Sequence, residues 1–213
     1  ITPKPVGVRH ISSLQQLSVY LSICIKSMLH SAKNRSIYYI NKFHVRNDYF
    51  VIDNNKPILD FLNYDTTQKG LKSISTYDFS TLYTSIPHIQ LKENLRMFVE
   101  RVFDFKDKSY ITPIVYTKKA YFSDNVSKSK VHFSKDTLLE CLNYLIDNSY
   151  VTYQGKIYRQ VIGIPMGTNA APQIANAYLH VYEYKYIKLL IEQEDTQNIE
   201  RLKDNFRYQD DLT

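Results

Sequence analysis

The chain has 213 residues, of which 44% are apolar, and this combination predicts a packed globular protein and excludes a disordered one. Lys and Arg outnumber Asp and Glu by 27 to 21, so the net charge is +6. A basic surface suits a polyanionic partner without identifying one. The two cysteines, Cys24 and Cys141, lie in apolar stretches and are expected to be core residues, not a disulfide framework. No apolar run reaches the roughly 18–20 residues of a membrane span and no secretory signal opens the chain, so an intracellular protein is expected.

The first half of the chain is expected to consist of helices around one strand. Between residues 14 and 29, apolar side chains recur at three- and four-residue steps, which predicts an amphipathic helix. Residues 53–64 predict a short second helix, with a proline in its first turn. A buried strand is expected at 71–79, after a glycine that breaks the chain. A further helix is predicted around 89–103.

The second half mixes short strands with two helices. Residues 113–133 are rich in Tyr, Val, Phe and Ser and predict short strands with turns. Ser134 is placed to cap the next helix. Residues 151–158 predict a hairpin, 170–191 a long helix, and 205–208 a short strand that is expected to be buried. This order of elements predicts an α+β fold, with an antiparallel sheet partly covered by helices.

Asp78 is the first residue that suggests chemistry. It comes directly after the predicted strand, and a carboxylate at the end of a buried strand is costly unless something pairs with it. The alternative is an ordinary Asx turn, since Asp at a strand end often stabilises the segment that follows. Asp78 alone does not decide between the two.

A loop with two glycines leads into the long helix. Gly163 and Gly167 flank Pro165, which predicts a loop of defined shape, and Gly167 permits close approach of the backbone to a ligand. Thr168 or Asn169 is expected to cap the helix, whose N-terminus would then favour a phosphate. The alternative is a purely structural junction between loop and helix.

A pair of adjacent carboxylates, Asp210 and Asp211, follows the aromatic segment that contains Phe206 and Tyr208. Adjacent carboxylates repel each other and attract a cation, although a polar turn is the simpler alternative. Together with Asp78 the pair becomes more informative. Carboxylates that meet from two neighbouring strands can hold two divalent ions roughly 3.5–4 Å apart, the arrangement used for in-line phosphoryl transfer.

At this point the chain resembles a known family. Three phrases occur in the order of motifs A, B and C of reverse transcriptases: Asp78-x4-Tyr83, Ile164-Pro165-Met166-Gly167 and Tyr208-x-Asp210-Asp211. Residues 4–11 are similar to the fingers segment whose basic side chains contact the incoming triphosphate. The wider phrases at 78–87 and 158–168 resemble Penelope-like retroelement polymerases.

The resemblance implies a right-hand polymerase fold. Residues 1–70 and about 105–160 would be fingers-like. Residues 71–104 and about 161–213 would form the palm, with its antiparallel sheet backed by helices. The thumb of such enzymes is expected to lie outside these 213 residues.

The resemblance also assigns metal ligands. Asp78, Asp210 and Asp211 would form the catalytic trio and hold two Mg²⁺ ions, with Mn²⁺ as a substitute. The backbone carbonyl of Phe79 would add a further ligand. Mg²⁺ prefers hard oxygen donors and uses few carboxylates together with the phosphates of its substrate.

Substrate-binding residues follow from the same motifs. Tyr83 would lie under the sugar of the incoming nucleotide, and Met166 and Gly167 would pack against the new base pair and the template. Arg9 and Lys4 would contact the triphosphate as charge-assisted donors. Many reverse transcriptases carry Gln where this chain has Met166, which removes one polar contact.

The activity implied is RNA-directed DNA synthesis within a retroelement. An RNA template, a DNA primer and dNTPs would be the partners, with no membrane involved. The enzyme would be intracellular, and nuclear in a eukaryotic host. Two alternatives remain open: an RNA-dependent RNA polymerase, and a catalytically silent nucleic-acid-binding scaffold derived from a polymerase.

Overall fold

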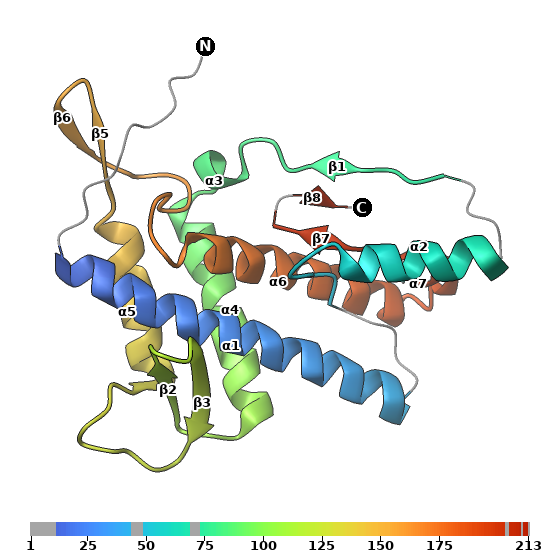
Figure 1. Ribbon diagram of the computed structural model, residues 1–213, viewed down its shortest axis with the longest axis horizontal. Coiled ribbons are helices and arrows are strands. Elements are labelled where there is room, and N and C mark those ends of the chain that lie inside the picture. The colour runs from blue at the N-terminus through green and yellow to red at the C-terminus, as the bar shows by residue number, and fades with distance from the viewer. Residues whose placement is uncertain (1–11, 44–48, 69–72, 203–204, 210, 213) are drawn as a thin grey trace.

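A computed structural model describes residues 12–43, 49–68, 73–202, 205–209 and 211–212 (Figure 1). Its helices are α1 (Ser12–Phe43), α2 (Lys56–Gln68), α3 (Leu82–Ser85), α4 (His88–Lys106), α5 (Lys135–Asp147), α6 (Ala171–Glu192) and α7 (Thr196–Leu202). Its strands are β1 (Tyr77–Asp78), β2 (Tyr110–Ile114), β3 (Lys119–Ser123), β4 (Phe133–Ser134), β5 (Tyr150–Tyr153), β6 (Lys156–Arg159), β7 (Arg207–Tyr208) and β8 (Asp211–Leu212). The α+β class is therefore confirmed.

Among the helices described, none combines the length and apolar character that crossing a membrane requires.

Four helices, α1, α4, α5 and α6, enclose one hydrophobic core (Figure 1). Each contributes apolar side chains at helical spacing, as the sequence predicted. Fully buried members include Leu21, Ile25, Met28, Leu91, Leu142, Ile146 and Ile174. Residues of the expected fingers and palm segments share this core, and the division into those two parts stays a prediction.

The predicted helices form, with ends set by local hydrogen bonds. Asn54 Oδ1 accepts a bond of 2.9 Å from the backbone N–H of Lys56, at the start of α2. Ser134 Oγ accepts one of 3.1 Å from the N–H of Thr137, so Ser134 is the N-cap of α5 as expected.

The predicted cap of α6 is wrong. The N-cap residue is Ala170, and no side chain caps the helix there. Thr168 turns its hydroxyl away from the helix and donates to the carbonyl of Pro165 at 2.8 Å. The N–H of Ala170 instead donates to Ser18 Oγ of α1 at 3.2 Å. This end of α6 is therefore fixed by a hydrogen bond to α1 in place of the expected side-chain cap, and phosphate binding at this end stays a prediction.

Strand pairing is antiparallel, but it is divided among three small sheets, with the orders β1–β8–β7, β3–β2–β4 and β5–β6. The sheet β3–β2–β4 lies against α1, where the N–H of Ala120 donates to Ser27 Oγ at 2.8 Å. The hairpin β5–β6 projects from the body of the molecule (Figure 1). The sheet β1–β8–β7 brings the middle of the chain beside its C-terminal segment.

The prediction of a buried strand at 71–79 is wrong for most of that segment. Within the part of 71–79 that the structure describes, only Tyr77 and Asp78 form a strand, and residues 71–72 lie outside the described residues. Ile74 and Tyr77 are 53% and 67% exposed. Within the described residues the segment pairs only with two residues of β8, at the edge of a sheet, and its side chains stay largely exposed.

Candidate functional site

Asp78 and Asp211 lie directly opposite each other on neighbouring strands. They are partners in the antiparallel pairing of β1 with β8. Residues paired in this way project to the same face of a sheet, with Cβ atoms roughly 4.5–5.5 Å apart. Asp78, the carboxylate of the first motif, is thus placed beside Asp211, the second carboxylate of the last.

The face that carries these two carboxylates is open to solvent. Tyr208 pairs with Asp211 in the hairpin β7–β8 and therefore shares this face. All three residues are exposed. Neither carboxylate forms an ion pair with any described residue. Within the same residues, the side chain of Asp78 accepts a hydrogen bond only from Ser80 Oγ, at 3.2 Å. The described residues contain no group of three potential metal ligands, and Asp210 lies outside them.

The opposite face of this sheet is held by Arg207, which the sequence did not single out. Its side chain is fully buried, whereas the expected core residue Tyr208 is 46% exposed. Arg207 forms an ion pair with Glu183 of α6 and donates to Asn176 Oδ1 at 2.8 Å. The prediction that the aromatic side chains of this strand face the core is therefore wrong for Tyr208.

Arg207 also supports the turn of the hairpin. Its Nη1 donates to the carbonyl of Gln209 at 2.8 Å. Gln209 has φ 56°, a left-handed conformation that costs a non-glycine residue roughly 1–2 kcal/mol. The buried guanidinium thus holds in place a two-residue turn whose own sequence does not favour it.

The partner of Arg207 is charged at neutral pH. Burial acts to raise the pKa of Glu183, but His180 and Arg207 outweigh it, and the pKa of this carboxyl lies below its ordinary value. His180 Nδ1 lies 3.7 Å from Glu183 Oε2, too far for a good hydrogen bond. The ion pair therefore persists down to acidic pH, where protonation of Glu183 would weaken it.

The chain turns sharply after Asp78. Thr81 has φ 65°, and the N–H of Leu82 donates to the carbonyl of Phe79 at 3.1 Å. A turn is therefore present at residues 80–81, and the short helix α3 follows it. A carbonyl has two acceptor lone pairs, so this bond leaves one on Phe79 for another partner.

The glycine loop is bonded to α3. The N–H of Ile164 donates to the carbonyl of Tyr83 at 2.8 Å, and the N–H of Gly163 to that of Ile86 at 2.7 Å. Gly163 has φ 90°, and a Cβ atom there would overlap the Tyr83 carbonyl oxygen. Only glycine permits this approach, so the sequence explains how the second motif joins the first.

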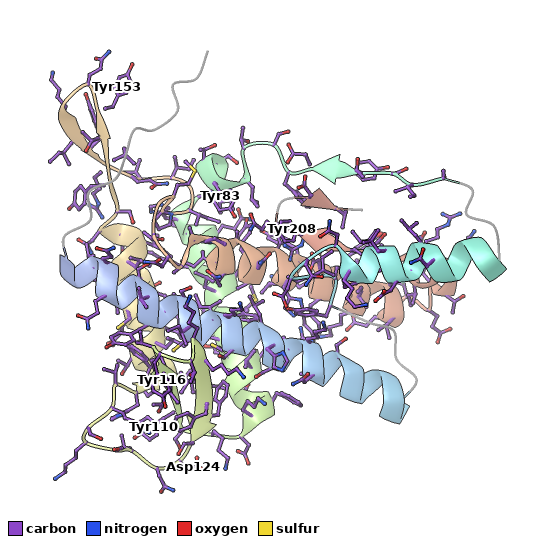
Figure 2. The ribbon with its side chains drawn as sticks, in the orientation of Figure 1. Tyr83, Tyr110, Tyr116, Asp124, Tyr153 and Tyr208 are labelled. Carbon is purple, nitrogen blue, oxygen red and sulfur yellow. The ribbon has the colours of Figure 1, made fainter. Side chains whose placement is uncertain are left out.

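The remaining predicted site residues are only partly brought together. Tyr83 is partly buried and packs against the hydrophobic core, while Met166 is half-buried and Gly167 exposed with φ 87°. Figure 2 shows Tyr83 and Tyr208 on the side of the molecule that carries β1 and β8. Lys4 and Arg9 lie outside the described residues.

A signal for Arg207 was present in the sequence of α6. Asn176, His180 and Glu183 recur at i, i+4 and i+7, which places three polar side chains on one stripe of a helix rich in apolar residues. Such a buried polar stripe needs a partner. Its partner in the structure is Arg207, which belongs to a strand that the sequence analysis treated as aromatic.

No protein-family model matches this chain, and no curated protein matches its sequence. The motifs and the geometry of the paired carboxylates are therefore what indicate its function.

Proposed function

We propose that the chain is part of an RNA-directed DNA polymerase that extends a primer with dNTPs in a reaction dependent on two Mg²⁺ ions. The observation that carries the proposal is the cross-strand pair of Asp78 and Asp211. Like charges placed directly opposite each other destabilise a sheet. A cation between them would turn this repulsion into attraction.

The chemistry of the donors fits Mg²⁺. Both side chains supply hard carboxylate oxygens, both are exposed, and neither is neutralised by a described basic residue. Mn²⁺ accepts the same oxygen ligands. Asp210, next to Asp211 in the chain, and the carbonyl of Phe79 would complete the set. When bound, the two ions supply charge neutralisation and alignment of the attacking and leaving oxygens.

The surrounding residues would orient the nucleotide. The bonds from the glycine loop to α3 hold the backbone of Tyr83 against Ile164. In this proposal Tyr83 lies under the sugar, while Met166 and Gly167 contact the nascent base pair and the template. Lys4 and Arg9 would contact the triphosphate. The partners are an RNA template and a DNA primer, and the protein would serve a Penelope-like retroelement inside the cell, in the nucleus of a eukaryotic host.

The test compares two variants of the carboxylate pair with a matched control. Asp78→Asn and Asp211→Asn each remove one metal-binding charge. Asp107→Asn removes the same charge from an exposed helix end where φ is 50°, a conformation that Asn tolerates. Loss of several kcal/mol of transition-state stabilisation should lower primer extension by about a hundredfold or more for the pair variants only.

Stability provides a second readout for the same variants. Removing one of two facing charges should leave folding unchanged or strengthen it by about 0.2–1 kcal/mol. Mg²⁺ should raise the melting temperature of the wild type more than that of either variant, because it binds only the folded site. Full extension by both variants at the Mg²⁺ concentration that supports the wild type would overturn the proposal.

Tyr83 separates a DNA polymerase from an RNA polymerase. If its ring lies under the sugar, Tyr83→Val should raise incorporation of ribonucleotides relative to deoxyribonucleotides, because the smaller side chain leaves room for a 2′ hydroxyl. If the ring serves only the core, the variant should lose stability and slow both substrates equally. A wild type that prefers ribonucleotides would favour the RNA-dependent RNA polymerase instead.

A further inference from the structure

A broad concavity of about 930 Å³ lies beside the hairpin β7–β8. Its walls come from α1, the end of α4, the turn before β3 and β3 itself, the segment 49–53, the start of α6, and Tyr208 and Gln209 of the hairpin. Among the described residues that line it, Asp53 is the only acidic one. Its basic lining residues, besides His30, are Lys26, Lys33, Lys106, Lys108, Lys118 and Lys119. We call this surface the lysine groove.

Four of these lysines form no ion pair within the described part of the chain. Lys108 forms an ion pair with Asp124 at 2.6 Å, and Lys106 lies over the rings of Phe105 and Phe122. The other four, Lys26, Lys33, Lys118 and Lys119, form no ion pair with any residue that the structure describes, and all four are exposed. Like charges gathered in one concavity repel each other and raise the local concentration of anions.

The lysines are brought together by folding and do not form a charge run. Lys26 and Lys33 are seven residues apart on α1, which places them on one face of the helix. Lys118 and Lys119 come from a turn about 90 residues later, held against α1 by the bond from Ala120 to Ser27. The tertiary structure therefore joins two basic pairs into one surface, beside the candidate carboxylates.

We propose that the lysine groove binds the sugar–phosphate backbone of single-stranded nucleic acid. The inference rests on the proposed function, because the hairpin that ends the groove also carries Asp211 on β8. A strand lying in the groove would have one end beside the carboxylate pair. Exposed tyrosines line the same surface, with Tyr121 39% and Tyr208 46% exposed, and aromatic rings beside lysines suit stacked bases better than an acidic peptide.

The experiment measures binding of a fluorescent oligonucleotide in EDTA, so that catalysis plays no part. The groove variant carries Lys26→Gln, Lys33→Gln, Lys118→Gln and Lys119→Gln. The control variant carries the same charge change at exposed lysines outside the groove: Lys56→Gln, Lys128→Gln, Lys185→Gln and Lys188→Gln. Each protein is titrated at several salt concentrations, and its melting temperature is recorded to confirm folding.

The groove variant should bind roughly tenfold to a hundredfold more weakly than the wild type. Its slope of log affinity against log salt should fall by about 0.7 for each lysine that contacts a phosphate, while the control keeps the wild-type slope. Equal affinity and slope in the groove variant and the wild type would overturn the inference. So would competition by poly-glutamate as strong as that by unlabelled oligonucleotide, which would indicate an acidic protein partner.

The binding experiment can succeed or fail independently of the test of the proposed polymerase activity. Asp78→Asn should bind the oligonucleotide at least as tightly as the wild type, because it removes a negative charge and leaves every lysine of the groove in place. If the wild type binds through the groove but never extends a primer, the polymerase proposal fails and the nucleic-acid site stands. If extension depends on Asp78 while the groove variant binds normally, the groove inference alone is overturned.

Discussion

The hairpins β5–β6 and β7–β8 have turns of the same length but reach them by different means. The turn of β5–β6 consists of Gln154 and Gly155, with φ 49° and 75°, the left-handed pair that a tight hairpin requires. The turn of β7–β8 contains Gln209, also left-handed, but no glycine. In place of glycine, the buried Arg207 holds the carbonyl of Gln209.

The two hairpins also differ in how closely they contact the rest of the molecule. Both strands of β5–β6 are largely exposed, and Tyr153 lies at the end of a projection, far from Tyr208 (Figure 2). The hairpin β7–β8 is fixed to the body from below, through Glu183 and Asn176 of α6. Local sequence therefore determines the first hairpin, and tertiary contacts determine the second, which carries Asp211.

The largest expected effect comes from removing the arginine of each hairpin. Arg207→Met leaves Glu183 buried without its partner, which should lower the free energy of unfolding by about 3–5 kcal/mol. Arg159 of β6 donates to the carbonyl of Asp147 at 2.8 Å on an exposed surface. Arg159→Met should therefore lower the free energy of unfolding by only about 0.5–1.5 kcal/mol. Urea unfolding of the two variants measures both values.

A double variant of the Arg207–Glu183 ion pair tests whether the unpaired buried charge causes the loss of stability. Arg207→Met with Glu183→Leu removes both charges and should recover part of the lost stability, because no unpaired charge then remains buried. Equal losses for the two single arginine variants would show that the hairpins do not differ in the way described here.

Two glycines provide a smaller contrast. Gly155→Ala introduces a Cβ atom into open space, so its cost is the left-handed backbone alone, about 1–2 kcal/mol. Gly163→Ala adds an overlap with the carbonyl of Tyr83, and overpacking of this kind costs about 1–3 kcal/mol more. Denaturant unfolding should rank Gly163→Ala as clearly the less stable variant. Equal stability of the two would mean that the loop moves away from α3 without cost.

The contrast also explains which parts of the structure were predictable. The spacing of apolar residues predicted α1, α4, α5 and α6, and Gln154-Gly155 predicted β5–β6, because each signal acts within a few residues. The strand expected at 71–79 was mostly wrong, since only Tyr77 and Asp78 among its described residues pair with another strand. A strand depends on partners distant in sequence, which composition does not show.

The candidate site likewise has one part that local sequence predicted and one part that depends on distant residues. Its residue types were visible as motifs, and the facing positions of Asp78 and Asp211 agree with carboxylates on neighbouring strands. Arg207 was missed because its partners on α6, Asn176 and Glu183, lie 31 and 24 residues earlier in the chain. An arginine between two aromatic residues gives no local indication that it is the buried member of the strand.

The smallest expected effect tests whether Arg207 compensates for the turn. Asn tolerates a left-handed backbone better than Gln, so Gln154→Asn and Gln209→Asn should each stabilise the protein slightly, by about 0.5 kcal/mol. The two substitutions should differ in their dependence on Arg207. Gln209→Asn made in the Arg207→Met background should stabilise more than it does in the wild type, because the unsupported turn then relies on its own conformational preference. Gln154→Asn lies in a separate hairpin, and distant sites are additive to within about 0.3–0.5 kcal/mol. A double-mutant cycle with urea unfolding, replicated finely enough to resolve a difference of this size, measures both couplings. Additivity of Gln209→Asn with Arg207→Met would show that the bond from the arginine to Gln209 does not hold the turn, and that its conformation arises from the strands on either side.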